Sequence, residues 1–352
     1  MYCLRTALLP VIGLFNAAYA RLDTDSASNL AVYWGQNSYN QGSGNLTQQP
    51  LGYYCENTNI DVFQLAFVTV INGIGGAPQV NFANQGDNCT TFPGTDLLNC
   101  PQIGADITKC QGKGKTIILS IGGATYSEGG FGSEEEAIAG ANLIWETFGP
   151  QKNSSRPRPF GDATVDGFDL DFEATVRNMV PFANRLRSLM AADASKKYFL
   201  TVAPQCPYPD LYNKEMLEGK VDFDAVFVQF YNNFCGLNTF EPGQEEQKSF
   251  NLGEWNEWAK TVSKNKKVRV IVGAPANQRA AGSGYVDASK LAEIVKYSRK
   301  FSSFGGVMLW DASQAYANGN FIETVKGALN SGFAGCRFGW RRTQMPMARP
   351  VV

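Results

Sequence analysis

The chain has 352 residues, enough for one large barrel or two ordinary domains, and its composition is that of a soluble globular protein. Lysine plus arginine (31) nearly balance aspartate plus glutamate (32), so the charge favours neither nucleic-acid binding nor electrostatic attachment to a membrane. The chain contains no histidine. This excludes Ser-His-Asp and Cys-His catalysis, argues against a zinc enzyme, and leaves carboxylates, tyrosines and lysines for acid–base chemistry.

Residues 1–20 have the pattern of a secretory signal peptide. Arg5 supplies a charged start, residues 7–15 an apolar stretch, and residues 18–20 a small-residue cleavage site. The alternative is a transmembrane anchor, but the apolar stretch is too short to span a bilayer, and no later segment is long and apolar enough. We therefore expect a secreted, extracellular protein with no membrane attachment.

Eight short apolar runs rich in β-branched and aromatic residues follow one another along the chain. They are residues 30–34, 62–70, 116–121, 167–172, 199–203, 225–230, 268–274 and 305–309. Such nearly continuous apolar runs favour strands of a parallel sheet that is buried on both faces.

Helical patterns lie between these runs. After the fourth run, for example, Met179, Ala183, Leu186 and Met190 recur at helical spacing. Eight strands alternating with helices over roughly 300 residues predict an α/β protein with a single (β/α)8 TIM barrel. An open, doubly wound sheet is the alternative.

The ends of the chain and its cysteines complete the outline. We expect the barrel to span residues 25–331 and the basic, acid-free residues 332–352 to form an irregular tail without a lipid-anchor signal. Seven cysteines remain after the signal, so at most three internal pairs can form. Sequons at Asn45, Asn88 and Asn153 are compatible with a glycosylated secreted protein.

The fourth strand carries the most informative pattern. Residues 166–173 read Asp-Gly-Phe-Asp-Leu-Asp-Phe-Glu, and alternation along a strand places Asp169, Asp171 and Glu173 on one face. Same-face neighbours lie about 6.6 to 6.8 Å apart at their Cα atoms, and three carboxylates this close repel, so at least one should hold a proton near neutral pH. A structural ion network or a divalent-metal site is the alternative. Asp166 has the opposite parity, and we interpret it as structural.

Other polar and aromatic residues follow neighbouring strands. Glu173 ends the fourth strand, Tyr231 and Asn232 the sixth and Trp310 the eighth, while Tyr33 and Gln36 lie at the end of the first. Because active sites of (β/α)8 barrels lie at the carboxyl ends of the strands, these residues should converge on one mouth.

These motifs resemble glycoside hydrolase family 18, and within it the class III, hevamine-type chitinases of plants and fungi. Residues 166–173 match the D-x-x-D-x-D-x-E signature, and residues 120–123 match the S-x-G-G motif of the third strand. Further matches lie at residues 31–37, 203–207, 228–233, 281–285 and 306–310. The resemblance covers about residues 30–329 and implies a barrel that needs no cofactor and no metal.

The resemblance also implies a function. It points to a secreted endochitinase that hydrolyses β-1,4 bonds of N-acetylglucosamine polymers with retention, because the substrate's own acetamido oxygen forms an oxazolinium intermediate. Its implied roles are general acid and base for Glu173, acetamido orientation for Asp171, proton sharing with Asp171 for Asp169, a hydrogen bond to the acetamido carbonyl for Tyr231, and a sugar floor for Trp310.

Five further residues match positions that line the sugar cleft: Tyr33, Gln36, Asn81, Gln229 and Asn232. Core packing or turn formation is the alternative for each. We expect Ser120, Gly122 and Gly123 to serve close packing beneath the site, and Trp145, Trp255 and Trp258 to pack in the core.

The class III pattern further implies two sets of covalent features. The disulfides would be Cys55–Cys110, Cys89–Cys100 and Cys206–Cys235, with Cys336 unmatched. Non-proline cis peptides would lie at Ala66–Phe67 and Trp310–Asp311.

Two rival functions share the same barrel. A non-catalytic chitin lectin or inhibitor would typically lose the acid, whereas Glu173 and both aspartate partners are present. An endo-N-acetylglucosaminidase acting on glycoproteins shares the signature, but the continuous class III motifs argue against it. We therefore expect a monomer whose partners are chitin and chito-oligosaccharides.

Overall fold

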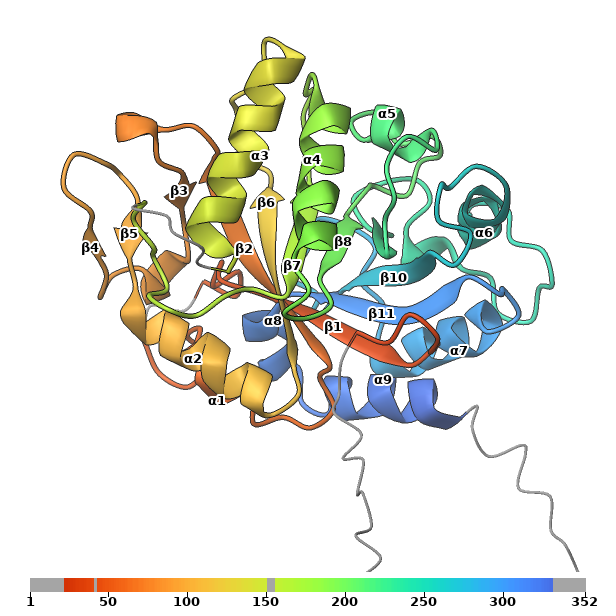
Figure 1. Ribbon diagram of the computed structural model, residues 1–352. Helices are drawn as coiled ribbons and strands as arrows, with labels where there is room; N and C mark the ends of the chain where they lie inside the picture. The colour runs from red at the N-terminus through yellow and green to blue at the C-terminus, as the bar shows by residue number, and fades with distance from the viewer. Residues whose placement is uncertain (1–21, 41–42, 151–155, 332–352) are drawn as a thin grey trace, which may run out of the picture.

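The computed structural model describes residues 22–40, 43–150 and 156–331 (Figure 1). The expected signal peptide, the expected C-terminal tail with Cys336, and the sequon at Asn153 lie outside the described residues.

A closed barrel of eight parallel strands forms the centre of the molecule (Figure 1). In order around the barrel the strands are β1 (Asn29–Trp34), β2 (Val62–Val70), β6 (Thr116–Gly122), β7 (Gly167–Asp171), β8 (Phe199–Val202), β9 (Ala225–Gln229), β10 (Arg269–Pro275) and β11 (Phe304–Trp310). β1 pairs with both β2 and β11, so the sheet closes and the open-sheet alternative is excluded. Every predicted strand is confirmed to within one residue at each end.

Helices cover the outside of the barrel (Figure 1). The longer ones are α2 (Pro101–Gly112), α3 (Glu134–Phe148), α4 (Met179–Ala192), α6 (Leu252–Thr261), α7 (Ala288–Ser298) and α9 (Phe321–Asn330). Short helices are α1 (Leu51–Tyr54), α5 (Lys214–Leu217) and α8 (Ala312–Tyr316), with 3-10 turns η1 (Ile74–Gly76), η2 (Ala83–Gln85) and η3 (Leu237–Thr239). No helix in the described ranges is long and apolar enough to cross a lipid bilayer.

Local sequence explains where several helices begin. The hydroxyl of Ser133 accepts the Glu136 N–H and three glutamates fill the first turn of α3, which suits the positive end of the helix dipole. Asp287 caps α7 by accepting the N–H of Lys290.

The apolar core has two layers. Phe168, Leu170 and Phe172 point outward from β7 and pack in the large layer between barrel and helices, as strand alternation predicted. A smaller layer fills the barrel interior. Trp255 and Trp258 are buried in α6, and Trp145 packs against the outer layer from α3, so their expected core positions are confirmed.

Three short strands escaped the sequence analysis because two-residue strands leave no hydrophobic pattern. β3 (Gln79–Val80) pairs antiparallel with β2, and β4 (Thr90–Thr91) forms a hairpin with β5 (Leu98–Asn99). The three implied disulfides, Cys55–Cys110, Cys89–Cys100 and Cys206–Cys235, are all present.

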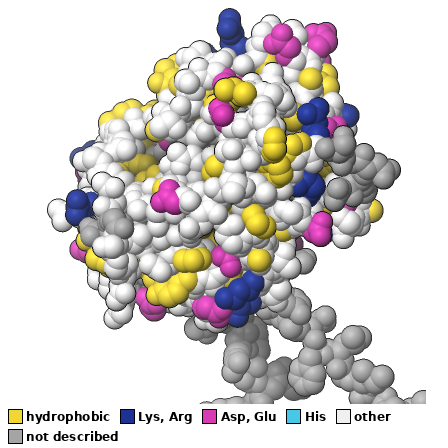
Figure 2. Space-filling view, turned by 90° about the vertical axis from the view of Figure 1, so that its left-hand side faces the viewer, with side chains coloured by type: hydrophobic (Ala, Val, Ile, Leu, Met, Phe, Trp, Pro, Cys, Tyr) yellow, Lys and Arg dark blue, Asp and Glu magenta, His cyan; other side chains and the backbone are white. Residues whose placement is uncertain are grey.

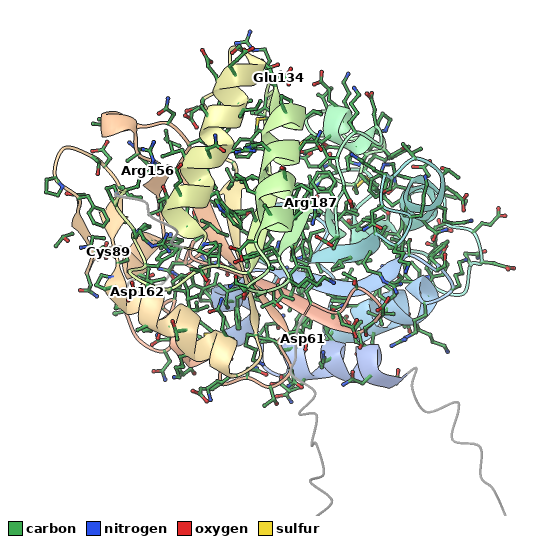
Figure 3. The ribbon with its side chains drawn as sticks, in the orientation of Figure 1. Asp61, Cys89, Glu134, Arg156, Asp162 and Arg187 are labelled. Carbon is green, nitrogen blue, oxygen red and sulfur yellow. A yellow bond between two sulfur atoms is a disulfide. The ribbon has the colours of Figure 1, made fainter. Side chains whose placement is uncertain are left out.

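An aspartate stands immediately before three of the barrel strands. Each accepts, at 2.8 to 2.9 Å, the backbone N–H of a residue on the neighbouring strand: Asp61 from Leu30, Asp166 from Ile117, and Asp224 from Leu200. Each also pairs with a cation: Asp61 with Lys326, Asp166 with Lys196, and Asp224 with Arg187. Figure 3 labels a member of two of these pairs: Asp61, before β2 and near α9, and Arg187, on α4. The amino end of the barrel is thus tied together by ion pairs.

The surface carries little charge segregation on the face shown in Figure 2. Acidic and basic side chains are scattered over this face rather than gathered into one charged patch, and hydrophobic side chains lie among them.

Candidate active site

The three acids of the fourth barrel strand lie at its carboxyl end, as predicted. Asp169 and Asp171 belong to β7 and are 0% and 3% exposed. Glu173 follows two residues after the strand and is half-buried. The acids therefore share one face of the chain but differ in depth, from the barrel interior to its mouth.

Asp169 sits in a cradle of hydroxyl groups. It accepts hydrogen bonds from Tyr33 Oη at 2.7 Å, Ser120 Oγ at 2.8 Å and Thr201 Oγ1 at 2.6 Å. Burial raises the pKa of Asp169 above its ordinary value, and these hydroxyl donors oppose that rise by stabilising the carboxylate. Donors from β1, β6 and β8 thus converge on one carboxylate.

Asp171 has less support for a negative charge. It accepts a hydrogen bond from the amide of Gln229, whose Nε2 donates to Oδ1 at 3.0 Å and also to the carbonyl of Ala203. Burial raises the pKa of Asp171 well above its ordinary value, and the charges of Glu173, Asp169 and Asp210 raise it further. Its surroundings therefore favour the protonated form of Asp171.

Glu173 also has a raised pKa. Burial is the main cause, the charge of Asp210 adds to it, and hydrogen bonding to Gln229 opposes it. In the described part of the chain no lysine or arginine forms an ion pair with Asp169, Asp171 or Glu173. The alternative of a structural ion network therefore finds no support at this end of β7.

Asp210 is a fourth acid of the site, and the sequence analysis missed it. It lies in the loop between β8 and α5, is 2% exposed, and acts electrostatically on both Asp171 and Glu173. Its loop has no strand or helix periodicity, so no sequence pattern could place it beside β7.

Tyr231 follows β9 and is 7% exposed. Burial raises its pKa well above the ordinary value for tyrosine, and the charges of Asp171, Glu173 and Asp169 add to the rise. The phenol therefore remains protonated at neutral pH and can serve as a hydrogen-bond donor.

An aromatic wall stands on the β1, β2 and β11 side of the mouth. The ring of Trp310 lies 5.3 Å from that of Tyr33 and stacks on Phe67 at 6.0 Å between centroids. Trp310 was predicted as a sugar floor, whereas Phe67 was named only for its cis peptide bond. The implied cis peptides at Ala66–Phe67 and Trp310–Asp311 are present, and a further one occurs at Tyr208–Pro209.

Three predicted cleft residues also bond to backbone groups around the mouth. Gln36 Nε2 donates to the carbonyls of Gly35, Ala66 and Asn81. The side-chain oxygen of Asn81 accepts the Ala83 N–H, and that of Asn232 accepts the N–H groups of Gly282 and Ser283. These contacts organise loops of the mouth and match the alternative reading of turn formation.

The strand-three motif lies beneath the site. Ser120 is fully buried there, and besides packing closely its hydroxyl donates to Asp169. Gly122 fits the expectation, because its φ is +119° and a Cβ there would lie 2.2 Å from the carbonyl oxygen of Asp171. Gly123 packs similarly against the ring of Phe67.

The described residues contain no group of three or more His, Cys, Asp or Glu side chains arranged to hold a metal ion.

A family model described as glycosyl hydrolases family 18 matches residues 29–288. This range includes the acids of β7, Asp210 and Tyr231. The chain belongs to glycosyl hydrolase family 18.

Curated relatives narrow the group within family 18. A class III chitinase of Arthroderma benhamiae is 59% identical over 330 residues, which cover 92% of this chain and 93% of the relative. Endochitinase 33 of Trichoderma harzianum is 47% identical over 326 residues, which cover 92% and 98% of the two chains. The resemblance to class III chitinases found in the sequence is confirmed.

A solved structure illustrates the limits of the fold as evidence. The xylanase and α-amylase inhibitor protein of Scadoxus multiflorus is 28% identical, with a TM-score of 0.68 over 85% of this chain and 98% of that one. That protein is named for inhibition rather than hydrolysis, so this fold does not by itself establish catalysis. The side chains of the site must distinguish a hydrolytic enzyme from an inhibitor with the same fold.

Proposed function

We propose that the protein is a secreted endochitinase that hydrolyses β-1,4-linked N-acetylglucosamine polymers with retention of configuration. The observation that carries the proposal is a set of three acids at the end of β7, which lie at different depths between the barrel interior and its mouth: Asp169, Asp171 and Glu173. Each has a raised pKa, and none has an ion-pairing cation among the described residues. Class III and endochitinase relatives of high identity support the substrate class.

Glu173 is the proton donor in this proposal. A raised pKa keeps its carboxyl group protonated at a pH where an ordinary glutamate would be ionised, so it can protonate the leaving glycosidic oxygen. Once ionised, the same group can accept a proton from the water that completes hydrolysis. Its half-buried position at the mouth gives it access to substrate.

Asp171 and Tyr231 would control the substrate's acetamido group. In family 18 that group attacks the anomeric carbon, so no protein nucleophile is needed. The protonated phenol of Tyr231 can donate to the acetamido carbonyl, while Asp171 orients the acetamido N–H and stabilises the positive charge of the oxazolinium intermediate.

Asp169 would keep the proton on its partner. Three hydroxyl donors favour the ionised form of Asp169, whereas Asp171 has one amide donor and several negative neighbours. A proton shared by the pair therefore resides mainly on Asp171 until positive charge develops on the substrate.

The aromatic wall would hold the reacting sugar. Trp310 is partly exposed and is buttressed by Tyr33 and Phe67, which gives it a fixed ring face toward the mouth. An apolar sugar face can lie on that ring while Glu173 approaches from the opposite side of the barrel, because β7 and β11 are four strands apart.

Secretion is supported by the three disulfides, which persist in oxidising compartments, and by the signal-like residues 1–20. Asn45 and Asn88 are exposed and available for glycans. Amino-terminal sequencing of protein recovered from culture medium tests this proposal, which requires a mature chain lacking residues 1–20.

A non-catalytic chitin-binding protein is the second candidate, since a named inhibitor shares the fold. Product analysis on a chitin hexamer decides between the two. We expect shorter oligomers with the β-anomer as initial product, and binding without turnover would favour the lectin. Release of glycans from a glycoprotein, without cleavage of the hexamer, would instead indicate an endo-N-acetylglucosaminidase.

A further inference from the structure

Asp210 is a buried carboxylate to which the proposed mechanism gives no role. Its Oδ1 accepts the backbone N–H groups of Tyr212 at 3.1 Å and Asn213 at 2.6 Å, and its Oδ2 accepts that of Gln205 at 3.1 Å. Within the described residues no lysine or arginine pairs with it, so N–H donors alone support its charge. Burial raises the pKa of Asp210 above its ordinary value and these donors oppose the rise.

Two hydrogen bonds connect Asp210 to the backbone that carries Glu173. Nδ2 of Asn213 donates to Oδ1 of Asp210 at 2.8 Å and to the carbonyl of Phe172 at 3.0 Å. Phe172 stands between Asp171 and Glu173 in the chain, and Asn213 is 1% exposed. Both amide hydrogens of Asn213 are thus committed, which fixes the orientation of the group.

This connection begins at the residue where the backbone hydrogen bonds between β7 and its neighbouring segments end. The carbonyl of Leu170 accepts the N–H of Ala203, and the carbonyl of Asp171 accepts that of Gly123. β7 ends at Asp171, and the next carbonyl, that of Phe172, is held by the Asn213 side chain. The last fixed backbone group before Glu173 therefore depends on a loop rather than on a strand.

We propose that Asp210 is a positioning residue: it orients the Asn213 amide, which holds the Phe172 carbonyl and so fixes the backbone from which Glu173 projects. The inference rests on the proposed role of Glu173 as the acid. It assigns to the loop between β8 and α5 a direct part in the alignment of that acid.

The charge of Asp210 has a second, separable consequence. It raises the pKa of Asp171 and Glu173, and the other groups that face these two acids are Asp169 on β7, Tyr231 and the neutral amide of Gln229. All of these titratable neighbours are acids. Removing the charge of Asp210 should therefore lower the pKa of Glu173 and move the loss of activity to a lower pH.

Two substitutions separate position from charge. Asp210→Asn removes the charge but keeps an oxygen for the Asn213 amide, and it should shift the alkaline limb of the kcat/KM profile on chitin hexamer to lower pH. Asn213→Ala keeps the charge and its three backbone donors but cuts the link to Phe172. It should lower kcat about three- to tenfold, with the pH limb and KM unchanged.

Glu218→Gln provides the matched control, because it makes the same charge change at an exposed position just after α5. It should leave kcat and the pH profile unchanged. Circular dichroism establishes folding. If Asn213→Ala fails to fold, Asp210→Ala, which removes the acceptor of the Asn213 amide, tests the positioning role by its kcat relative to Asp210→Asn.

A folded Asn213→Ala enzyme with wild-type kcat would overturn the positioning role. A folded Asp210→Asn enzyme with an unmoved pH limb would overturn the separate effect of the Asp210 charge on Glu173. Glu173→Gln in the same assay keeps the two hypotheses apart. If Glu173→Gln retains turnover, the proposed function fails. If Glu173→Gln is inactive while the Asp210 and Asn213 variants behave as wild type, only the positioning role fails.

Discussion

The two ends of β7 hold aspartates in opposite surroundings. At the amino end, Asp166 lies 2.7 Å from the ammonium of Lys196 and accepts the N–H of Ile117 at 2.8 Å. At the carboxyl end, Asp169 and Asp171 meet hydroxyl groups and an amide, with no cation within ion-pair distance among the described residues. A paired cation ties a carboxylate to the framework, whereas burial without one leaves the acid free to exchange a proton.

The contrast extends around the barrel. Asp61 and Asp224 repeat the arrangement of Asp166 before β2 and β9, each with a neighbouring-strand N–H and a cation. The amino end of the barrel therefore uses aspartates for cohesion. We propose that the carboxyl end uses them for chemistry, as is general in such barrels. Four measurements test this division.

The largest effect is expected from Glu173→Gln, which keeps the shape of the side chain but removes its transferable proton. Turnover of a chitin hexamer should fall by about 10²- to 10⁴-fold while binding, measured by calorimetry, is retained. Asp166→Asn makes the same charge change at the other end of the strand and should leave kcat of the folded enzyme near wild type. Substantial turnover by Glu173→Gln would break the assignment of chemistry to the carboxyl end.

Asp166→Ala should act on stability instead. It removes a largely buried ion pair and a backbone cap, so the free energy of unfolding should fall by about 2 kcal/mol. Urea titration followed by fluorescence measures the loss. Lys196→Met, which leaves Asp166 without its cation, should also destabilise the protein. An unchanged urea midpoint in both variants would show that the amino-end pair contributes nothing.

Ser120→Ala tests the hydroxyl cradle. Losing one donor should make ionised Asp169 less favourable by about 1 kcal/mol and lower kcat about fivefold. Ser303→Ala is the matched control, since Ser303 is a buried serine with a single hydroxyl bond to Asn256 just before β11. Equal losses of kcat in the two variants would argue that Ser120 acts through general packing.

The smallest effect concerns the pH dependence of stability. Folding raises the pKa of Asp171 above its unfolded value of about 4. The stability that the protonated side chain contributes is therefore fully present below that pH and is lost as pH rises through the folded pKa. Asp171→Asn cannot ionise and should therefore melt at a higher temperature than wild type at pH 7. The difference should shrink toward pH 4. A difference in melting temperature that is constant with pH would contradict the raised pKa.

The barrel strands were predictable because their signals are local. Runs of apolar residues buried on both faces located all eight strands to within one residue. The two-residue strands β3, β4 and β5 were missed because so few residues show no periodicity. Family resemblance, rather than any local pattern, supplied the disulfide pairs, which the structure confirms.

The sequence by itself determined that Asp169, Asp171 and Glu173 share a face, since the two-residue period of a strand is a property of neighbouring residues. Only the tertiary structure decided what surrounds them. The hydroxyls of Tyr33, Ser120 and Thr201 and the amide of Gln229 reach the acids from 32 to 136 positions away in the chain. Asp210 likewise reaches them through a loop. The surroundings of a buried acid set its pKa, and in this barrel they come from five separate segments.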